Sequence, residues 1–145
     1  MAIADRSAQC IWDGDLAHGK GTVNGASGAL GDLPVTWASR TGRSEGRTSP
    51  EELIAAAHAS CFSMALSNEL SQGGNAPDQL EVTAHVTLDE RDGAPSITTS
   101  ELTVSGRVPG VDQEAFTKAA TNAGEMCPVS RALGDVEISV RATLA

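Results

Sequence analysis

The sequence predicts an α+β fold whose elements follow the order β-β-β-α-β-β-α-β. Three observations lead to this prediction. A long, almost entirely apolar segment at residues 48–70 carries the start signals of a helix, and segments on both sides of it alternate apolar and polar residues as half-buried strands do. A shorter amphipathic segment near the C-terminus predicts a second helix. We expect antiparallel sheets packed around the central apolar helix, in a single domain that spans residues 1–145.

Three short strands are predicted before the apolar helix. Residues 8–12 and 20–24 are separated by the segment DGDLAHG, whose Asp and Gly residues mark a turn. Residues 34–39 (PVTWAS) alternate well enough to form a third strand. The segment at 40–47 (RTGRSEGR) is polar and contains glycine, so we expect it to be a mobile loop that leads directly into the helix.

The start of the apolar helix is strongly marked. Ser49 is a good N-cap, Pro50 suits the first helical position because its missing N–H is not needed there, and Glu52 completes a capping box. Apolar or small residues then occupy nearly every face of the helix, so it must be surrounded. We expect two protomers to enclose it together as a homodimer. The uncharged run is shorter than the roughly 20 residues that cross a bilayer, so no membrane span is predicted.

A long β-hairpin is predicted after the helix. Residues 80–89 place apolar side chains on one face and polar side chains on the other, which is typical of a half-buried antiparallel strand. Residues 91–95 contain the turn. Residues 96–108 are rich in threonine, and their apolar positions change parity, which indicates a β-bulge.

A second helix and a closing strand complete the predicted fold. Asp112 can cap a helix that runs to about residue 125, with apolar residues at helical spacing. Pro128 disfavours helical geometry at Cys127 and can begin a new short turn, so Cys127 is expected at a junction. Residues 136–144 alternate as a last strand.

Composition excludes several function classes. The formal net charge of −9 argues against nucleic acid or an anionic membrane as partners, because few groups are available to neutralise phosphate. No positively charged N-terminus precedes an apolar run, so we read no signal peptide and expect a cytoplasmic protein. The three cysteines, Cys10, Cys61 and Cys127, are too few and too far apart for a disulfide-stapled secreted domain, which favours redox or catalytic use.

Two of these cysteines suggest a chemistry, although spacing alone does not establish that they meet. Cys61 lies in the apolar helix and Cys127 at the helix junction, as a nucleophile and its resolving partner would. Peroxide reduction needs a thiolate, which a nearby guanidinium favours and an apolar wall opposes. Glu51 could orient an arginine through a bidentate pair. Oxidation to a sulfenic acid and condensation to a disulfide would then close a cycle without a metal or an organic cofactor.

The segments TSPEELIAAAHASCFSMALS and CPVSRAL resemble the OsmC/Ohr family of thiol peroxidases, and the first is closer to the OsmC branch. The resemblance covers essentially the whole chain, and it implies an OsmC-like fold in an intertwined, domain-swapped homodimer with active sites at the interface. It also implies reduction of organic hydroperoxides and, less well, of hydrogen peroxide. The implied reductant is a dithiol, typically a dihydrolipoyl group on a lipoylated protein.

The same resemblance implies roles for individual residues. The peroxidatic cysteine of the family falls on Cys61, its resolving cysteine on Cys127, and its acidic residue on Glu51. The activating arginine precedes the helix, where Arg40, Arg43 and Arg47 are all candidates. We favour Arg40 because it directly follows the expected strand end at WAS, where the arginine of the family tends to lie.

Three other functions stay open at this point. His58 could activate Cys61 in a cysteine hydrolase or acyltransferase, a class that also needs an oxyanion hole and has no use for Cys127. A structural zinc site could use the two cysteines and a histidine, but the paired ligand spacing of such sites is missing. A dimeric module could bind a lipid or acyl chain without catalysis.

The remaining polar and apolar neighbours receive structural interpretations. We expect His58 to be a hydrogen-bonded structural group and Cys10 to be a packed or idle thiol. His18 and His85 are expected at the surface. The apolar neighbours of Cys61 are expected in the core, where some could also wall an organic substrate pocket; they are Ile54, Phe62 and Met64.

Overall fold

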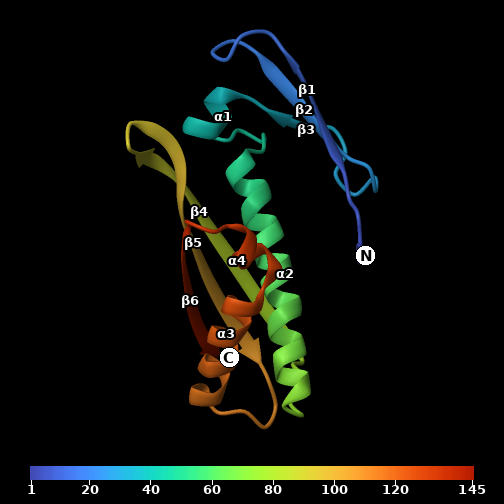
Figure 1. The fold of residues 1–145 in the computed structure, drawn as a ribbon, viewed down its shortest axis with the longest axis vertical. Coiled ribbons are helices and arrows are strands. Elements are labelled where there is room, and N and C mark those ends of the chain that lie inside the picture. Colours follow the sequence, from blue (N-terminus) through green and yellow to red (C-terminus); the bar gives the residue numbers. More distant parts are fainter. The chain divides into compact units, whose positions relative to one another are not determined.

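The computed structural model describes all 145 residues, which divide into two compact units, Met1–Leu53 and Ile54–Ala145. Two three-stranded sheets are present, one in each unit. The single domain over residues 1–145 stays a prediction. The elements are, in chain order, β1 (Ala8–Asp13), β2 (Lys20–Gly25), β3 (Leu33–Val35), α1 (Trp37–Thr41), α2 (Pro50–Gln72), β4 (Gln79–Arg91), β5 (Ala94–Arg107), α3 (Gln113–Met126), α4 (Pro128–Ala132) and β6 (Glu137–Leu144) (Figure 1).

The first sheet has the antiparallel order β1-β2-β3, so the three predicted strands are present. The third strand is shorter than predicted, and the expectation of strand geometry through residue 39 is wrong. Thr36 caps α1 with a reciprocal pair of 3.0 Å hydrogen bonds, in which Ser39 N donates to Thr36 Oγ1 and Thr36 N donates to Ser39 Oγ. This local capping ends the strand, so Arg40 lies on α1 and not in a loop.

The start of α2 is confirmed at the predicted cap. Glu52 N donates to Ser49 Oγ at 3.1 Å. The other half of the predicted capping box is wrong, because the Glu52 carboxylate accepts a hydrogen bond from Thr48 Oγ1 at 2.8 Å and not from the Ser49 backbone. The helix ends at Gln72, followed by Gly74 at a φ of 84°. None of the helices of the chain is long and apolar enough to span a membrane.

The hairpin of the second unit follows the prediction. Strands β4 and β5 pair antiparallel across a turn at Asp92 and Gly93, both with positive φ. The bulge is also confirmed: Thr87 pairs with Thr99 whereas Leu88 pairs with Ile97, so one residue of β5 has no opposite partner.

The closing strand β6 contradicts the expectation of wholly antiparallel sheets. It pairs parallel to β5, from Thr99 opposite Glu137 to Gly106 opposite Leu144. The reason is the connection between these strands. Helices α3 and α4 carry the chain back to the level at which β5 began, and a crossover of this length delivers the next strand in the same direction. The second sheet is therefore mixed.

One core fills the second unit, where α2 and α3 pack on the same face of the β4-β5-β6 sheet (Figure 1). The approach is close: a Cβ at Gly106 of β5 would lie only 2.5 Å from Phe116 Cζ of α3. The fully buried hydrophobic residues that hold the three elements together are Phe62, Leu66, Leu102, Val104, Phe116, Ala120 and Cys127.

The apolar helix is not surrounded within one chain. Phe62 is fully buried, as predicted, and Ile54 is partly buried, but Met64 is 71% exposed and its prediction as a core residue is wrong for the single chain. Met64 belongs to an exposed stripe at four-residue spacing on α2 that also contains Ala56, Ser60 and Asn68. The stripe has no charged residue, so it is unusual for a solvent-facing helix surface.

Candidate active site

Two thiols come together in the second unit from distant parts of the sequence. Cys61 lies near the middle of α2 and is partly buried, whereas Cys127 is fully buried in the core. Cys127 sits between α3 and α4 with a φ of −57° and a ψ of 122°, and Pro128 opens α4. The predicted junction is therefore confirmed, and its extended backbone is the geometry that a following proline favours. Both cysteines are free thiols.

The surroundings of Cys61 favour its protonated, thiol form. Burial raises the pKa of the Cys61 thiol above its ordinary value, and the neighbouring Cys127 thiol raises it further. The backbone N–H of Val129, at the start of α4, acts in the opposite direction by hydrogen bonding to the sulfur. The effect of Cys127 on this pKa also shows that the two sulfurs are close neighbours.

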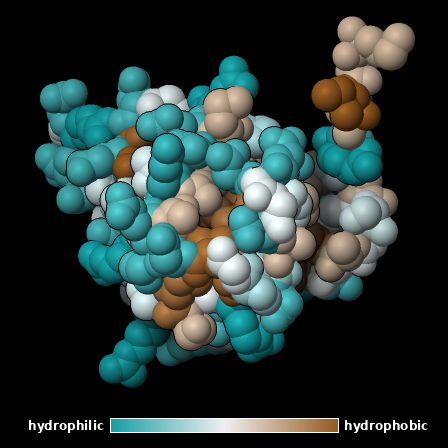
Figure 2. All heavy atoms as spheres, turned by 90° about the horizontal axis from the view of Figure 1, so that it is seen from below, coloured by the Kyte–Doolittle hydropathy of each residue, from teal (hydrophilic) through white to brown (hydrophobic).

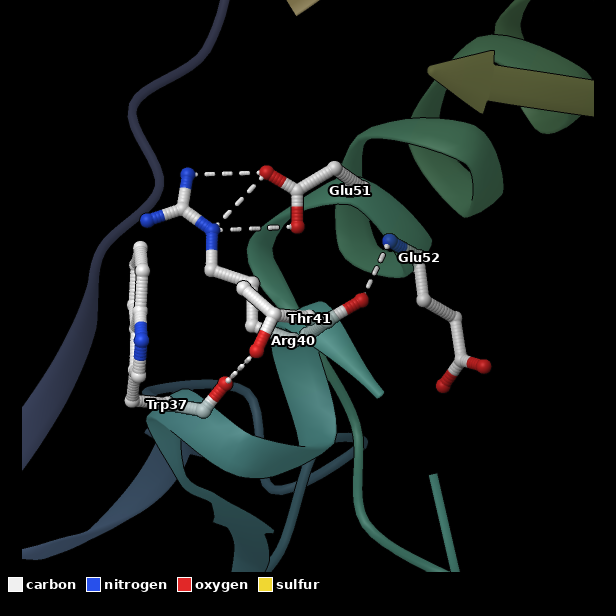
Figure 3. Close-up of polar contacts among 6 residues, drawn as sticks. Trp37, Arg40, Thr41, Glu51 and Glu52 are labelled. Atoms are coloured by element: carbon white, nitrogen blue, oxygen red, sulfur yellow. Dashed lines mark hydrogen bonds and ion pairs between the residues drawn. The ribbon is translucent and has the colours of Figure 1, made fainter. Parts of the chain in front are cut away.

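Arg40 and Glu51 form a second cluster, in the first unit (Figure 3). Arg40 Nη2 donates to Glu51 Oε1 at 2.8 Å, and Arg40 Nε donates to Oε1 at 3.0 Å and to Oε2 at 3.2 Å. The carboxylate is mostly buried, with a side chain that is 11% exposed, against 29% for the arginine. This bidentate geometry is the strong form of a guanidinium–carboxylate pair, and it fixes the direction of the guanidinium.

The aromatic ring of Trp37 adds a third side chain to this cluster. Arg40 Cζ lies 5.8 Å from the ring centroid, and Figure 3 shows the ring beside the guanidinium. The sequence interpretation missed this residue because the segment was read as a strand. In a helix, residues three apart lie on one face, so the W-x-x-R spacing of α1 was the available signal.

The structure separates the three candidate arginines. Arg40 is the one that pairs with Glu51. Arg47 makes a long surface contact of 3.7 Å with Glu45, and Arg43 has no ion pair. The role of Arg40 as the activating residue stays a prediction.

His58 is held away from the role of a base for Cys61. Its side chain is fully buried, its Nδ1 lies 2.6 Å from Ser100 Oγ, and its Nε2 lies 2.8 Å from Ser130 Oγ. Both ring nitrogens are thus engaged by hydroxyl groups. This agrees with the prediction of a structural histidine and removes the base that the hydrolase alternative needs.

The other candidates lie at the surface. His18 and His85 are exposed, as predicted. Cys10 is an exposed free thiol on the edge strand β1, so it is not packed. No group of three His, Cys, Asp or Glu side chains is placed to hold a metal ion, which counts against the zinc alternative.

Comparisons with known proteins found similar sequences and a similar fold. A family model described as OsmC-like protein matches residues 42–141, a range that contains Glu51, Cys61 and Cys127. The chain is 43% identical to Peroxiredoxin OsmC of Escherichia coli (strain K12) over 128 residues, which cover 88% of this chain and 89% of that protein. It is 36% identical to Organic hydroperoxide resistance protein-like 1 of Staphylococcus saprophyticus over 95 residues, covering 64% of this chain and 67% of that protein. The crystal structure of the organic hydroperoxide resistance protein OhrB of Bacillus subtilis has a TM-score of 0.72 and 27% identity, covering 94% of this chain and 98% of that chain.

Proposed function

Because the chain belongs to the OsmC-like protein family and is a cysteine-based peroxidase, we propose that it reduces organic hydroperoxides to alcohols and, less efficiently, hydrogen peroxide to water. Relatives named for organic hydroperoxide resistance support this choice of substrate. The proposal assigns the attack to Cys61 and the resolving step to Cys127. Arg40 and Glu51 complete the catalytic set.

The proposed cycle has three balanced steps. The Cys61 thiolate attacks the outer peroxide oxygen, the O–O bond breaks, and the alkoxide takes a proton to leave as the alcohol, so that Cys61 becomes a sulfenic acid. The Cys127 sulfur then attacks the sulfenic sulfur, water leaves, and a Cys61–Cys127 disulfide forms. An external dithiol reduces this disulfide by two exchanges and becomes a cyclic disulfide itself. We propose a dihydrolipoyl group on a lipoylated protein as that dithiol.

The proximity of the two thiols is the observation that carries the proposal. Cys127 affects the pKa of Cys61, so its sulfur already lies beside the sulfur that is to be oxidised. Cys127 is also fully buried. A buried thiol next to a partly exposed one is suited to receive a sulfenic acid that forms on the accessible side, because the second step becomes intramolecular.

Arg40 is assigned the activation of Cys61. Because the pKa of the Cys61 thiol is raised, thiolate formation benefits from a nearby positive charge, and a guanidinium can supply that charge. The pair with Glu51 holds the guanidinium in one orientation. Less side-chain conformational entropy is therefore lost when the guanidinium acts on the sulfur and the peroxide.

We propose that the functional species is a homodimer in the cytoplasm. The stripe of Ala56, Ser60, Met64 and Asn68 leaves uncharged helix surface exposed in the single chain. Figure 2 shows hydrophobic side chains reaching the surface between hydrophilic ones on the face it presents. Burying such surface against a second copy is favourable by about 25 cal/mol per Å² of apolar area.

Single-turnover oxidation tests the proposed function. The reduced protein is mixed with one equivalent of cumene hydroperoxide, and the products are mapped by mass spectrometry. We expect cumyl alcohol and a Cys61–Cys127 disulfide in the wild type, a trapped sulfenic acid on Cys61 in Cys127→Ser, and no alcohol in Cys61→Ser. Continued peroxidase turnover by Cys61→Ser would refute the proposal, as would unimpaired multiple turnovers by Cys127→Ser with a dithiol.

A further inference from the structure

A buried hydrogen-bond network joins three elements around the thiol pair, and the peroxidase cycle does not use it directly. The His58 ring of α2 bonds to Ser100 of β5 through Nδ1 and to Ser130 of α4 through Nε2, at 2.6 Å and 2.8 Å. The exposed fractions of these residues are 0%, 0% and 8%. Short hydrogen bonds between buried groups act as rigid links, because breaking one leaves a buried polar atom without a partner.

A neutral His58 ring can keep both hydrogen bonds of the network at the same time. A neutral imidazole has one donor and one acceptor nitrogen, and serine hydroxyls can take either complementary role. Burial lowers the pKa of His58, which favours this neutral form. No carboxylate takes part, and no buried side-chain polar atom of the chain lacks a partner. The ring therefore has neither a charge to stabilise nor a free nitrogen with which to move a proton.

The position of the link relates it to the two sulfurs. His58 precedes Cys61 by one helical turn on α2, and Ser130 follows Cys127 by three residues. Val129 lies between Cys127 and Ser130 in the sequence, and its backbone N–H bonds to the Cys61 sulfur. The same short segment is stiffened by a 3.0 Å hydrogen bond from Arg131 N to Cys127 O.

We propose that His58 is a positioning residue that pins the segment 127–130 to α2, so that Cys127 stands at a high effective concentration beside Cys61. The link to Ser130 ties the two thiol-bearing segments to each other, and the link to Ser100 anchors the ring to the sheet. An intramolecular thiol that is held in place reacts faster than one that samples many positions.

The link also protects Cys61, a consequence that rests on the proposed peroxidase function. A sulfenic acid on Cys61 meets either the Cys127 thiol, with loss of water, or a second hydroperoxide, which transfers an oxygen to give a sulfinic acid and an alcohol. Thiols do not reduce the sulfinic acid, so the oxidised protein leaves the catalytic cycle. Weakening the link should therefore shift the partition from the disulfide toward the sulfinic acid.

The test measures the thiol pair without peroxide. The wild type and three variants, His58→Gln, Ser130→Ala and Ser63→Ala, are equilibrated with glutathione redox buffers, and the disulfide fraction gives the effective concentration of the pair. Ser63→Ala is the matched control, because its hydroxyl bonds only within α2, to Ala59 O at 2.7 Å. We expect a fall of roughly tenfold in Ser130→Ala, at least as much in His58→Gln, and a change below about twofold in the control.

A second readout separates positioning from general weakening of the fold. Under excess cumene hydroperoxide, Ser130→Ala should yield several times more Cys61 sulfinic acid per turnover than the wild type. If His58→Gln fails to fold, Ser130→Ala carries the test alone. Effective concentrations within about twofold of the wild type in folded variants would overturn the inference. A tenfold shift in a chain without peroxidase activity would support the inference and refute the proposed function.

Discussion

Replacement of Glu51 by glutamine tests whether its carboxylate holds Arg40 in a working orientation. Glutamine has almost the same shape but carries no charge, and it offers one acceptor oxygen in place of two. In the structure the guanidinium makes three contacts with the carboxylate, at 2.8, 3.0 and 3.2 Å. Glu51→Gln therefore removes the charge and at least one of these contacts.

The expected size of the effect follows from burial. With side-chain exposures of 11% for Glu51 and 29% for Arg40, water screens the pair only in part. A hydrogen bond to a charged group contributes about 1.5–3 kcal/mol, and the amide oxygen retains some of this, so we expect a loss of about 1–2 kcal/mol. Since about 1.4 kcal/mol corresponds to a factor of ten, kcat/KM for an organic hydroperoxide should fall roughly 5- to 30-fold.

The assay is steady-state reduction of cumene hydroperoxide with dihydrolipoamide as the reductant. Glu45→Gln is the matched control, because Glu45 makes only a 3.7 Å surface contact with Arg47, and it should change kcat/KM by less than about twofold. In an Arg40→Ala background, already severely impaired, Glu51→Gln should cause no further loss. An equal loss in kcat/KM with and without Arg40 would refute the reasoning.

Three further predictions concern packing, protonation and the indole beside the guanidinium. Gly106→Ala should lower the free energy of unfolding by about 1–3 kcal/mol in urea titrations, because the new Cβ would lie 2.5 Å from Phe116 Cζ; an unchanged midpoint would contradict this. Since burial and Cys127 raise the pKa of the Cys61 thiol, its alkylation by iodoacetamide in an Arg40→Ala background should be slow near neutral pH and accelerate as the pH rises, and adding Cys127→Ala should move this curve to lower pH. A curve that stays in place would show that Cys127 is not a cause. Trp37→Leu should reduce kcat/KM roughly 2- to 5-fold, as expected for the loss of a cation–π contact of about 0.5–1 kcal/mol, and full activity would show that the ring does not support the guanidinium.

Sequence signals predicted the structure where the determining interactions are local. The Ser49 cap and the break before Pro128 depend on neighbouring residues alone, and both lie where the sequence placed them. The capping pair that starts α1 at Thr36 is equally local, but the apolar–polar alternation of PVTWAS favoured a strand prediction there. An alternation over only six residues is a weak signal, and a capping motif that satisfies two backbone N–H donors at once outweighs it.

Features that depend on distant segments could not be predicted in the same way. The parallel direction of β6 follows from the crossover through α3 and α4, and a strand of alternating residues carries no mark of its direction. Met64 lies in an apolar helix, yet its side chain is 71% exposed in the single chain, and helical spacing alone does not show which face the core will cover. The proximity of Cys127 to Cys61 likewise depends on tertiary packing. The resemblance of the two motifs to a known family predicts it, whereas their spacing in the sequence does not.

The two proposed steps make opposite demands on Cys61, and different residues meet them. Resolution needs a second thiol close by, but that thiol, together with burial, raises the pKa of Cys61 and so lowers its share of thiolate. The Val129 N–H only partly offsets this, and none of these influences comes from a positive charge. In the proposed cycle, a positive charge from outside the thiol pair therefore stabilises the Cys61 thiolate, and we propose Arg40 for this role. Loss of the arginine should leave Cys61 as an unreacted thiol, whereas loss of Cys127 should leave it as a sulfenic acid, so the two failures are chemically distinct.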